Sequence, residues 1–147
     1  MSTAEAIALQ RRIHAAIPLS EAMGYRITEL DDTRITVEAP LGPNVNIHGT
    51  GFAGSLYALG ILTAWGLCTH VIAGAGVDAE LVVAEANIRY RAPVRGDIAC
   101  NSRMTEAVAR SFVDGLVVRK RARARLEVEI GEGPAAVIQA LMYASCR

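Results

Sequence analysis

The segment from Gly51 to Val77 contains no Asp, Glu, Lys or Arg, and it constrains the fold more than any other part of the chain. A segment this long and apolar either spans a bilayer or forms a helix that the rest of a globular domain buries. Glycines recur through it, and Thr63, Thr69 and His70 interrupt it. No Lys or Arg lies close to either end, although membrane helices use such flanking charges for orientation. We therefore expect a buried helix and no membrane insertion.

Alternation of apolar and polar side chains predicts antiparallel strands on both sides of this helix. The expected elements are a short amphipathic helix at 3–16, a strand hairpin at 25–30 and 34–39, the buried helix at 52–72, and long strands at 81–91, 98–108, 116–130 and 135–144. In the strand at 116–130, small and apolar residues face inward, while arginines and glutamates face outward as a solvated surface. No repeat or linker divides the chain, so we expect one domain at 1–147.

These elements predict an α+β fold in which a curved antiparallel sheet wraps around one long buried helix. An apolar helix needs cover on most of its surface, and a curved sheet supplies that cover. Such a sheet leaves open edges, and pairing of the edges of two copies is the usual remedy. We therefore expect a homodimer or a dimer of dimers.

Charge and cysteine content narrow the range of functions. Lys and Arg together number 15, as do Asp and Glu, so the formal net charge is zero. A neutral chain is not suited to coating nucleic acid or an anionic membrane. The three cysteines, Cys68, Cys100 and Cys146, lie far apart and match no zinc-ligand spacing. We expect no metal, no bound cofactor and a reduced, cytoplasmic setting, because the N-terminus also lacks the order of a signal peptide.

Residues 44–59, NVNIHGTGFAGSLYAL, form a loop rich in Asn and Gly that leads directly into the apolar helix. Glycines in such a loop let the backbone approach a ligand closely. The free N–H groups of the helix start, near Gly54 and Ser55, favour a negative charge that develops on a carbonyl oxygen. Asn46 can add an amide donor, and His48 can donate or accept a proton near neutral pH. The segment therefore predicts a site that stabilises an oxyanion.

Each of these side chains also has a purely structural interpretation. Asn46 can hold a turn of the loop, and His48 can cap the helix or bond to the loop. Ser55 and Tyr57 can serve in capping and packing. Tyr57 lies one turn before Ile61, so both would line a pocket if this side of the helix faces one. The sequence leaves these alternatives open.

The same stretch, an asparagine-and-histidine loop followed by GTGFAGSLYAL, resembles the loop and helix start of hotdog-fold thioesterases. Within that superfamily it is most similar to the thioesterase family named after the C-terminal domain of YiiD. The turn at 90–97, YRAPVRGD, resembles the strand-to-turn signature of hotdog enzymes more loosely. The resemblance implies a hotdog fold and an acyl thioester of acyl carrier protein or CoA as substrate. For such a substrate, Arg91, Arg95 and Arg110 are candidate contacts to the phosphate of the pantetheine arm or to acidic carrier-protein helices.

The sequence departs from the thioesterase pattern at two positions. Many hotdog thioesterases carry an Asp or Glu on this helix as base or nucleophile, and Ile61 stands at that place here. Phe52 replaces the histidine of their helix start. Without a carboxylate to activate water, the residues favour decarboxylation of a malonyl thioester, which needs an oxyanion hole and a dry pocket. The resemblance points the same way, because the YiiD-like family is associated with this reaction at the start of fatty acid synthesis, as well as with thioester hydrolysis.

Decarboxylation is therefore the reaction expected from the sequence, with Asn46 and the helix N–H groups at the enolate and His48 in support. Hydrolysis is the alternative, in which His48 or a carboxylate from a partner chain activates water. A protein that binds acyl thioesters without turnover is the third alternative, since the usual base is missing.

Overall fold

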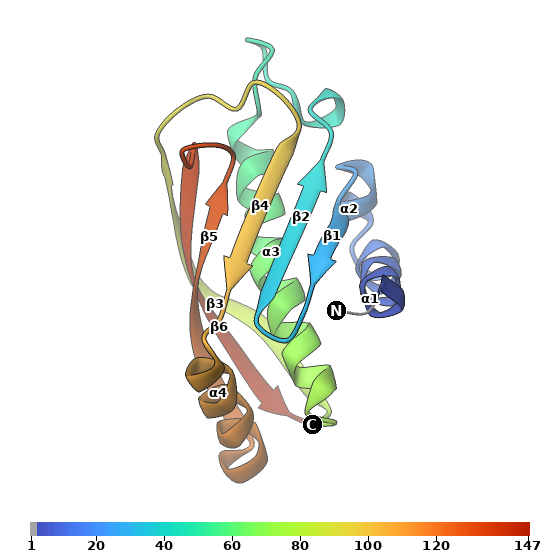
Figure 1. Ribbon diagram of the computed structural model, residues 1–147, viewed down its shortest axis with the longest axis vertical. Coiled ribbons are helices and arrows are strands. Elements are labelled where there is room, and N and C mark those ends of the chain that lie inside the picture. The colour runs from blue at the N-terminus through green and yellow to red at the C-terminus, as the bar shows by residue number, and fades with distance from the viewer. Residues whose placement is uncertain (1–2) are drawn as a thin grey trace.

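Residues 3–147 are described by the computed structural model, in which one antiparallel sheet curves around a long central helix (Figure 1). The sheet has six strands in the order β1-β2-β4-β5-β6-β3. This arrangement confirms the expected α+β fold class. The elements are α1 (Thr3–Ala16), α2 (Pro18–Ala22), β1 (Arg26–Leu30), β2 (Arg34–Ala39), a 3-10 turn (Gly42–Asn44), α3 (Ala53–Gly74), β3 (Ala79–Tyr90), β4 (Ile98–Arg103), α4 (Glu106–Arg119), β5 (Arg121–Ile130) and β6 (Ala136–Cys146).

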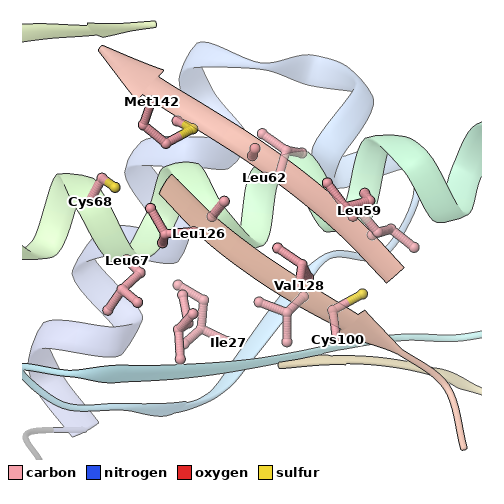
Figure 2. Packing of buried hydrophobic residues seen from close by; sticks show 14 of the residues in the cluster. Ile27, Leu59, Leu62, Leu67, Cys68, Cys100, Leu126, Val128 and Met142 are labelled. Carbon is pink, nitrogen blue, oxygen red and sulfur yellow. The ribbon is translucent and has the colours of Figure 1, made fainter. Parts of the chain in front are cut away.

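Helix α3 is the centre of the hydrophobic core. Leu59, Leu67 and Cys68 on this helix are fully buried, and Leu126 and Val128 of β5 belong to the same cluster (Figure 2). By length and composition α3 is apolar enough to cross a membrane, but 61% of its most apolar window is buried inside the domain. The uncharged segment of the sequence therefore serves as a core helix.

Two glycines of α3 allow the sheet to approach the helix closely. A Cβ built at Gly60 would clash with Ile138 Cδ1 of β6 and lie 3.0 Å from Ile130 Cδ1 of β5. A Cβ built at Gly66 would lie 3.0 Å from the hydroxyl of Tyr25, which donates a hydrogen bond of 3.1 Å to Leu62 O. Close packing against the sheet therefore accounts for glycines that recur within an otherwise apolar helix.

The expected strand at 98–108 was wrong in its second half. Strand β4 ends at Arg103, and residues 106–119 form helix α4. Thr105 starts this helix, because its hydroxyl accepts a hydrogen bond of 3.1 Å from Val108 N. Phe112 and Leu116, one helical turn apart, are both buried. Their four-residue spacing is helical, so α4 packs on the core instead of extending the sheet.

The expected strand at 116–130 was correspondingly too long, because β5 begins only at Arg121. Lys120 ends α4 in the left-handed conformation, with φ of 63°, and this turn redirects the chain into β5. From Arg121 onward the predicted alternation is confirmed. Inward residues are buried and outward ones are exposed along the whole strand.

The two edge strands of the sheet differ in their surroundings. Helix α1 packs beside β1, where Ile27 N donates a hydrogen bond of 2.9 Å to Gln10 Oε1. Among the described residues, no strand pairs with the outer edge of β3. The pairing of β3 with β6 shifts by one residue between Val83 and Glu85. This bulge leaves Ala84 exposed, although strict alternation with the half-buried Ala86 and Ile88 would turn it inward.

Candidate active site

The first turn of α3 presents backbone N–H groups that lack acceptors. Phe52 precedes the helix and makes no capping hydrogen bond with its side chain, while its carbonyl accepts a bond of 3.0 Å from Leu56 N. The N–H groups of Ala53, Gly54 and Ser55 have no hydrogen-bond partner among residues 3–147. Unpaired donors at the positive end of a helix dipole stabilise an anion or a developing oxyanion.

Asn46 organises the loop that leads into this turn. Its Oδ1 accepts hydrogen bonds from His48 N at 2.9 Å and from Thr50 N at 3.0 Å. Its Nδ2 donates to Thr50 Oγ1 at 2.9 Å and to Gly51 O at 3.3 Å. Both amide hydrogens therefore point at groups of the loop itself, so a direct contact between Asn46 and a substrate oxygen requires one of these bonds to be exchanged.

His48 lies at the tip of the same loop. Its ring is exposed and has no partner in the described part of the chain, and the neighbouring Ile47 side chain is 94% exposed. Gly49 follows with φ of 78°, a left-handed conformation that costs glycine little. The imidazole is therefore accessible to a ligand or to another chain, but the described residues do not enclose it in a pocket.

The Phe52 ring lies against Gly54, directly at the helix start. A Cβ built at Gly54 would be 2.5 Å from Phe52 Cε2 and 2.9 Å from Phe52 Cζ. Glycine is required here for close approach, because any side chain would displace the ring. Phe52 is 52% exposed, so the ring forms an apolar cover beside the unpaired N–H groups.

Two tyrosines connect the first turns of α3 to β3. Tyr90 Oη donates a hydrogen bond of 2.8 Å to Ala53 O, and Tyr57 Oη donates one of 3.1 Å to Ala86 O. Partial burial raises the pKa of Tyr90 above its usual value, and the neighbouring Tyr57 adds a smaller rise. The Tyr90 phenol therefore stays protonated at neutral pH, and the hydroxyls of both tyrosines act as hydrogen-bond donors beside the helix start.

Carboxylates are missing from the loop and from α3. No Asp or Glu occurs between Glu38 and Asp78, and Ile61 is a half-buried residue packed against the core. Glu85 of β3 is exposed beside the bulge, whereas Ala86 and Ile88 are half-buried on the side that packs on the core. The chain thus surrounds the first turns of α3 with amide, phenol and apolar groups. Among residues 3–147, no cluster of three His, Cys, Asp or Glu side chains could hold a metal ion.

The three candidate arginines do not lie together. Arg91 follows β3, and its N–H donates to Ala135 O at 2.7 Å, while Arg95 is exposed in the same turn. This turn is tied to the loop, because Gly51 N donates to Val94 O at 2.8 Å. Arg91 and Arg95 are therefore near the helix start.

Arg110 lies elsewhere, on α4. It lines a groove of about 340 Å³ together with His70 and Gly74, at the C-terminal end of α3. The 22 residues of α3 span about 33 Å at a rise of about 1.5 Å per residue. Within one chain, Arg110 is therefore at the opposite end of the helix from Asn46. Figure 1 shows α4 at the lower end of the molecule, where α3 also ends.

Two aromatic residues at this site were not among the sequence-based candidates. Tyr90 belonged to the turn at 90–97 and Trp65 to the expected buried helix at 52–72, but neither was proposed as a site residue. Trp65 Nε1 in fact donates a hydrogen bond of 3.2 Å to Leu81 O of β3. The spacing of Tyr57, Ile61 and Trp65 by four residues was the signal that could have placed all three on the side of α3 next to β3.

The curved antiparallel sheet wrapped around one buried helix defines a hotdog-fold protein. The family model described as "Putative thioesterase (yiiD_Cterm)" matches residues 6–141, and the chain belongs to this family.

Solved structures agree with this assignment. A putative thioesterase from Shewanella oneidensis, known from its crystal structure, is 31% identical, with a TM-score of 0.87 over 99% of this chain and 100% of that chain. A protein of unknown function from Chlorobaculum tepidum is 26% identical, with a TM-score of 0.91 over 97% and 94% of the two chains. A "probable thioesterase" from Pseudomonas aeruginosa, 24% identical over 96% of each chain, shares the fold with a TM-score of 0.79.

Proposed function

We propose that this protein hydrolyses acyl thioesters of CoA or acyl carrier protein at the N-terminus of α3. The observation that carries the proposal is the set of unpaired N–H groups on Ala53, Gly54 and Ser55, which the Asn46-organised loop leaves open. Membership of a putative thioesterase family and the similarity to the putative thioesterase from Shewanella oneidensis support hydrolysis. We further propose a cytoplasmic location, where such thioesters are used.

Hydrolysis at this site runs through a tetrahedral oxyanion. The thioester oxygen accepts hydrogen bonds from the N–H groups of Gly54 and Ser55, water adds to the carbonyl carbon, and the C–S bond then breaks. The departing thiolate takes up a proton, and a carboxylic acid is released. The exposed His48 is the base of this chain that can take the proton from water, since the loop and α3 carry no carboxylate.

Decarboxylation of a malonyl thioester is the second candidate, and the absence of acidic side chains from the loop and α3 favours it. The C–C bond to the malonyl carboxylate breaks, carbon dioxide leaves, and the electron pair forms an enolate whose oxygen meets the same N–H groups. A proton then returns to the enolate carbon and yields an acetyl thioester. A resident carboxylate would repel the malonyl group, whereas Ile61 does not.

Mass spectrometry of the intact carrier separates the alternatives. Purified protein is incubated in parallel with malonyl-carrier and with acyl-carriers that lack the second carboxylate. Free carrier from both substrates supports hydrolysis, whereas acetyl-carrier from the malonyl substrate alone supports decarboxylation. Intact substrates after binding has been demonstrated would show the non-catalytic alternative and reject both reactions.

We also propose that two copies pair through the open edge of β3. Arg147 N donates a hydrogen bond of 3.2 Å to Asp78 O, and Arg91 N donates one of 2.7 Å to Ala135 O. These two bonds, at the two ends of β3, show which residues of β3 direct their backbone groups toward β6. Alternation then directs the backbone groups of intervening residues, such as Ala79 and Ile88, toward the open edge, where Leu81 O and Ala86 O already accept hydrogen bonds from Trp65 and Tyr57. An antiparallel pair of β3 strands would place the acidic start of one strand, with Glu80, beside the basic end of the other, with Arg89.

Sedimentation equilibrium tests this pairing. Arg89→Glu is expected to weaken the dimer, and the double variant Glu80→Arg with Arg89→Glu is expected to restore it, because the charges are exchanged rather than removed. A monomeric wild-type protein at micromolar concentration would reject the proposal. Arg26→Glu, on the distant edge strand β1, is the matched control and should leave the association unchanged.

A further inference from the structure

Three half-buried side chains form a stripe along the side of α3 that lies next to β3. Tyr57, Ile61 and Trp65 are four residues apart, so they lie on one face of the helix. The first and last of them are held against β3 by the hydrogen bonds of Tyr57 to Ala86 O and of Trp65 to Leu81 O. The stripe begins at the candidate active site and runs toward the C-terminal end of α3.

A groove begins where this stripe ends. It has a volume of about 500 Å³ and lies between the C-terminal half of α3 and the first half of β3. Its lining combines apolar residues, among them Trp65, Leu81 and Val82, with charged ones, among them Arg12, Glu80 and Arg147. Among the α3 residues that line the groove, Trp65 is the nearest to the N-terminus of the helix. The indole therefore forms the wall of the groove that faces the candidate active site. The hydrogen bond to Leu81 O holds that wall in place.

We propose that Trp65 determines the acyl-chain length that the enzyme accepts, by separating the active site from the groove beyond it. This inference rests on the proposed function. The helix rises about 15 Å over the ten residues from Ser55 to Trp65 at about 1.5 Å per residue. The side chains of Tyr57 and Ile61 lie along this stretch of about 15 Å, so they shorten the space that an acyl chain could use. Short acyl groups end before the indole, whereas long ones would have to displace it.

Substitutions of Trp65 test whether the indole separates the active site from the groove, with acyl thioesters from acetyl to palmitoyl as substrates. Trp65→Ala opens the stripe into the groove, and we expect kcat/KM for long chains relative to short chains to rise by about tenfold or more. Trp65→Phe keeps an aromatic wall without the N–H, so its chain-length profile should stay close to that of the wild type. Val82→Ala is the matched control, because it trims the far wall of the groove and leaves the partition intact. An unchanged profile in a folded, active Trp65→Ala variant would overturn the inference.

Fluorescence gives a second readout that needs no turnover, because Trp65 is the only tryptophan in the chain. Acyl-pantetheine thioethers of increasing length serve as non-reactive probes. We expect the Trp65 emission of the wild type to shift progressively with chain length up to a limit, beyond which binding is lost. Binding of every chain length without any change in emission would overturn the inference. A wild type that turns over no thioester but shows the length-dependent shift would instead reject the proposed function and keep Trp65 as the limit of the binding site.

Discussion

The side chain of Asn46 holds Thr50 at two points, accepting a hydrogen bond of 3.0 Å from Thr50 N and donating one of 2.9 Å to Thr50 Oγ1. Thr50 is followed by Gly51, whose N–H donates to Val94 O at 2.8 Å. The loop is thereby fixed both to itself and to the turn after β3. Asn46 thus positions the approach to the first turn of α3, whether or not its amide also contacts substrate.

Replacement of Asn46 is expected to reduce both stability and activity. In Asn46→Ala the hydrogen bonds of Oδ1 and Nδ2 are lost, and chemical denaturation should show a free energy of unfolding lower by about 1–2 kcal/mol. Turnover should fall at least tenfold because the loop no longer fixes the site. Unchanged turnover in the folded variant would remove Asn46 from the mechanism.

Asn46→Asp distinguishes positioning from direct catalysis. The carboxylate keeps the acceptor contacts to the N–H groups of His48 and Thr50 but has no amide hydrogens to offer. If the amide donates a hydrogen bond to the substrate, Asn46→Asp should be nearly as stable as the wild type but as inactive as Asn46→Ala. Activity that follows stability in both variants would make Asn46 a positioning residue only.

A methyl group at Gly54 is expected to disturb the helix start through Phe52. The Cβ of Gly54→Ala would meet the Phe52 ring at 2.5 Å, so the ring must move from its place beside the unpaired N–H groups. We expect turnover to fall several-fold and stability to fall by about 1–3 kcal/mol, as for other overpacked sites. The double variant with Phe52→Ala removes the clash and should recover most of the lost stability. Failure of that rescue would show that the ring is not the obstacle.

Two glycines of the same helix should respond in opposite ways to alanine. Gly60→Ala places a methyl group against Ile138 and Ile130, and the free energy of unfolding should fall by about 1–3 kcal/mol. Gly74→Ala has no atom within 4 Å of the new Cβ and should stabilise the helix end by up to about 1 kcal/mol. Thermal and chemical denaturation of both variants measures the difference. Equal effects would contradict the close approach of α3 to the sheet.

The thiols should differ in reactivity. Burial raises the pKa of Cys68 and of Cys100 to about 12, so neither forms much thiolate at neutral pH. Cys146 is only half-buried. Titration of the native protein with a thiol reagent should therefore detect one group promptly, and all three after unfolding. Prompt reaction of three thiols in the native protein would contradict the packing of the core.

The sequence alone determined the parts of this protein in which a single periodic pattern extends over many residues. The uncharged run indicated α3 to within a few residues, and alternation identified the buried face of β5, because burial imposes one period over a whole element. Residues 106–119 were predicted poorly for the opposite reason. The short apolar groups around Phe112 and Leu116 fit a strand as well as a helix until the cap at Thr105 and the left-handed Lys120 are seen.

Only the tertiary structure decided how the candidate site is assembled. It turned the amide of Asn46 into the loop, brought Tyr90 from β3 to the first turn of α3, and placed Arg110 at the far end of that helix. Local sequence carries no information on these relationships, because each depends on which strand lies beside the helix and on the direction in which the chain returns. The chemical groups of the site are thus properties of the sequence, whereas their distances are set by the packing of the sheet around α3.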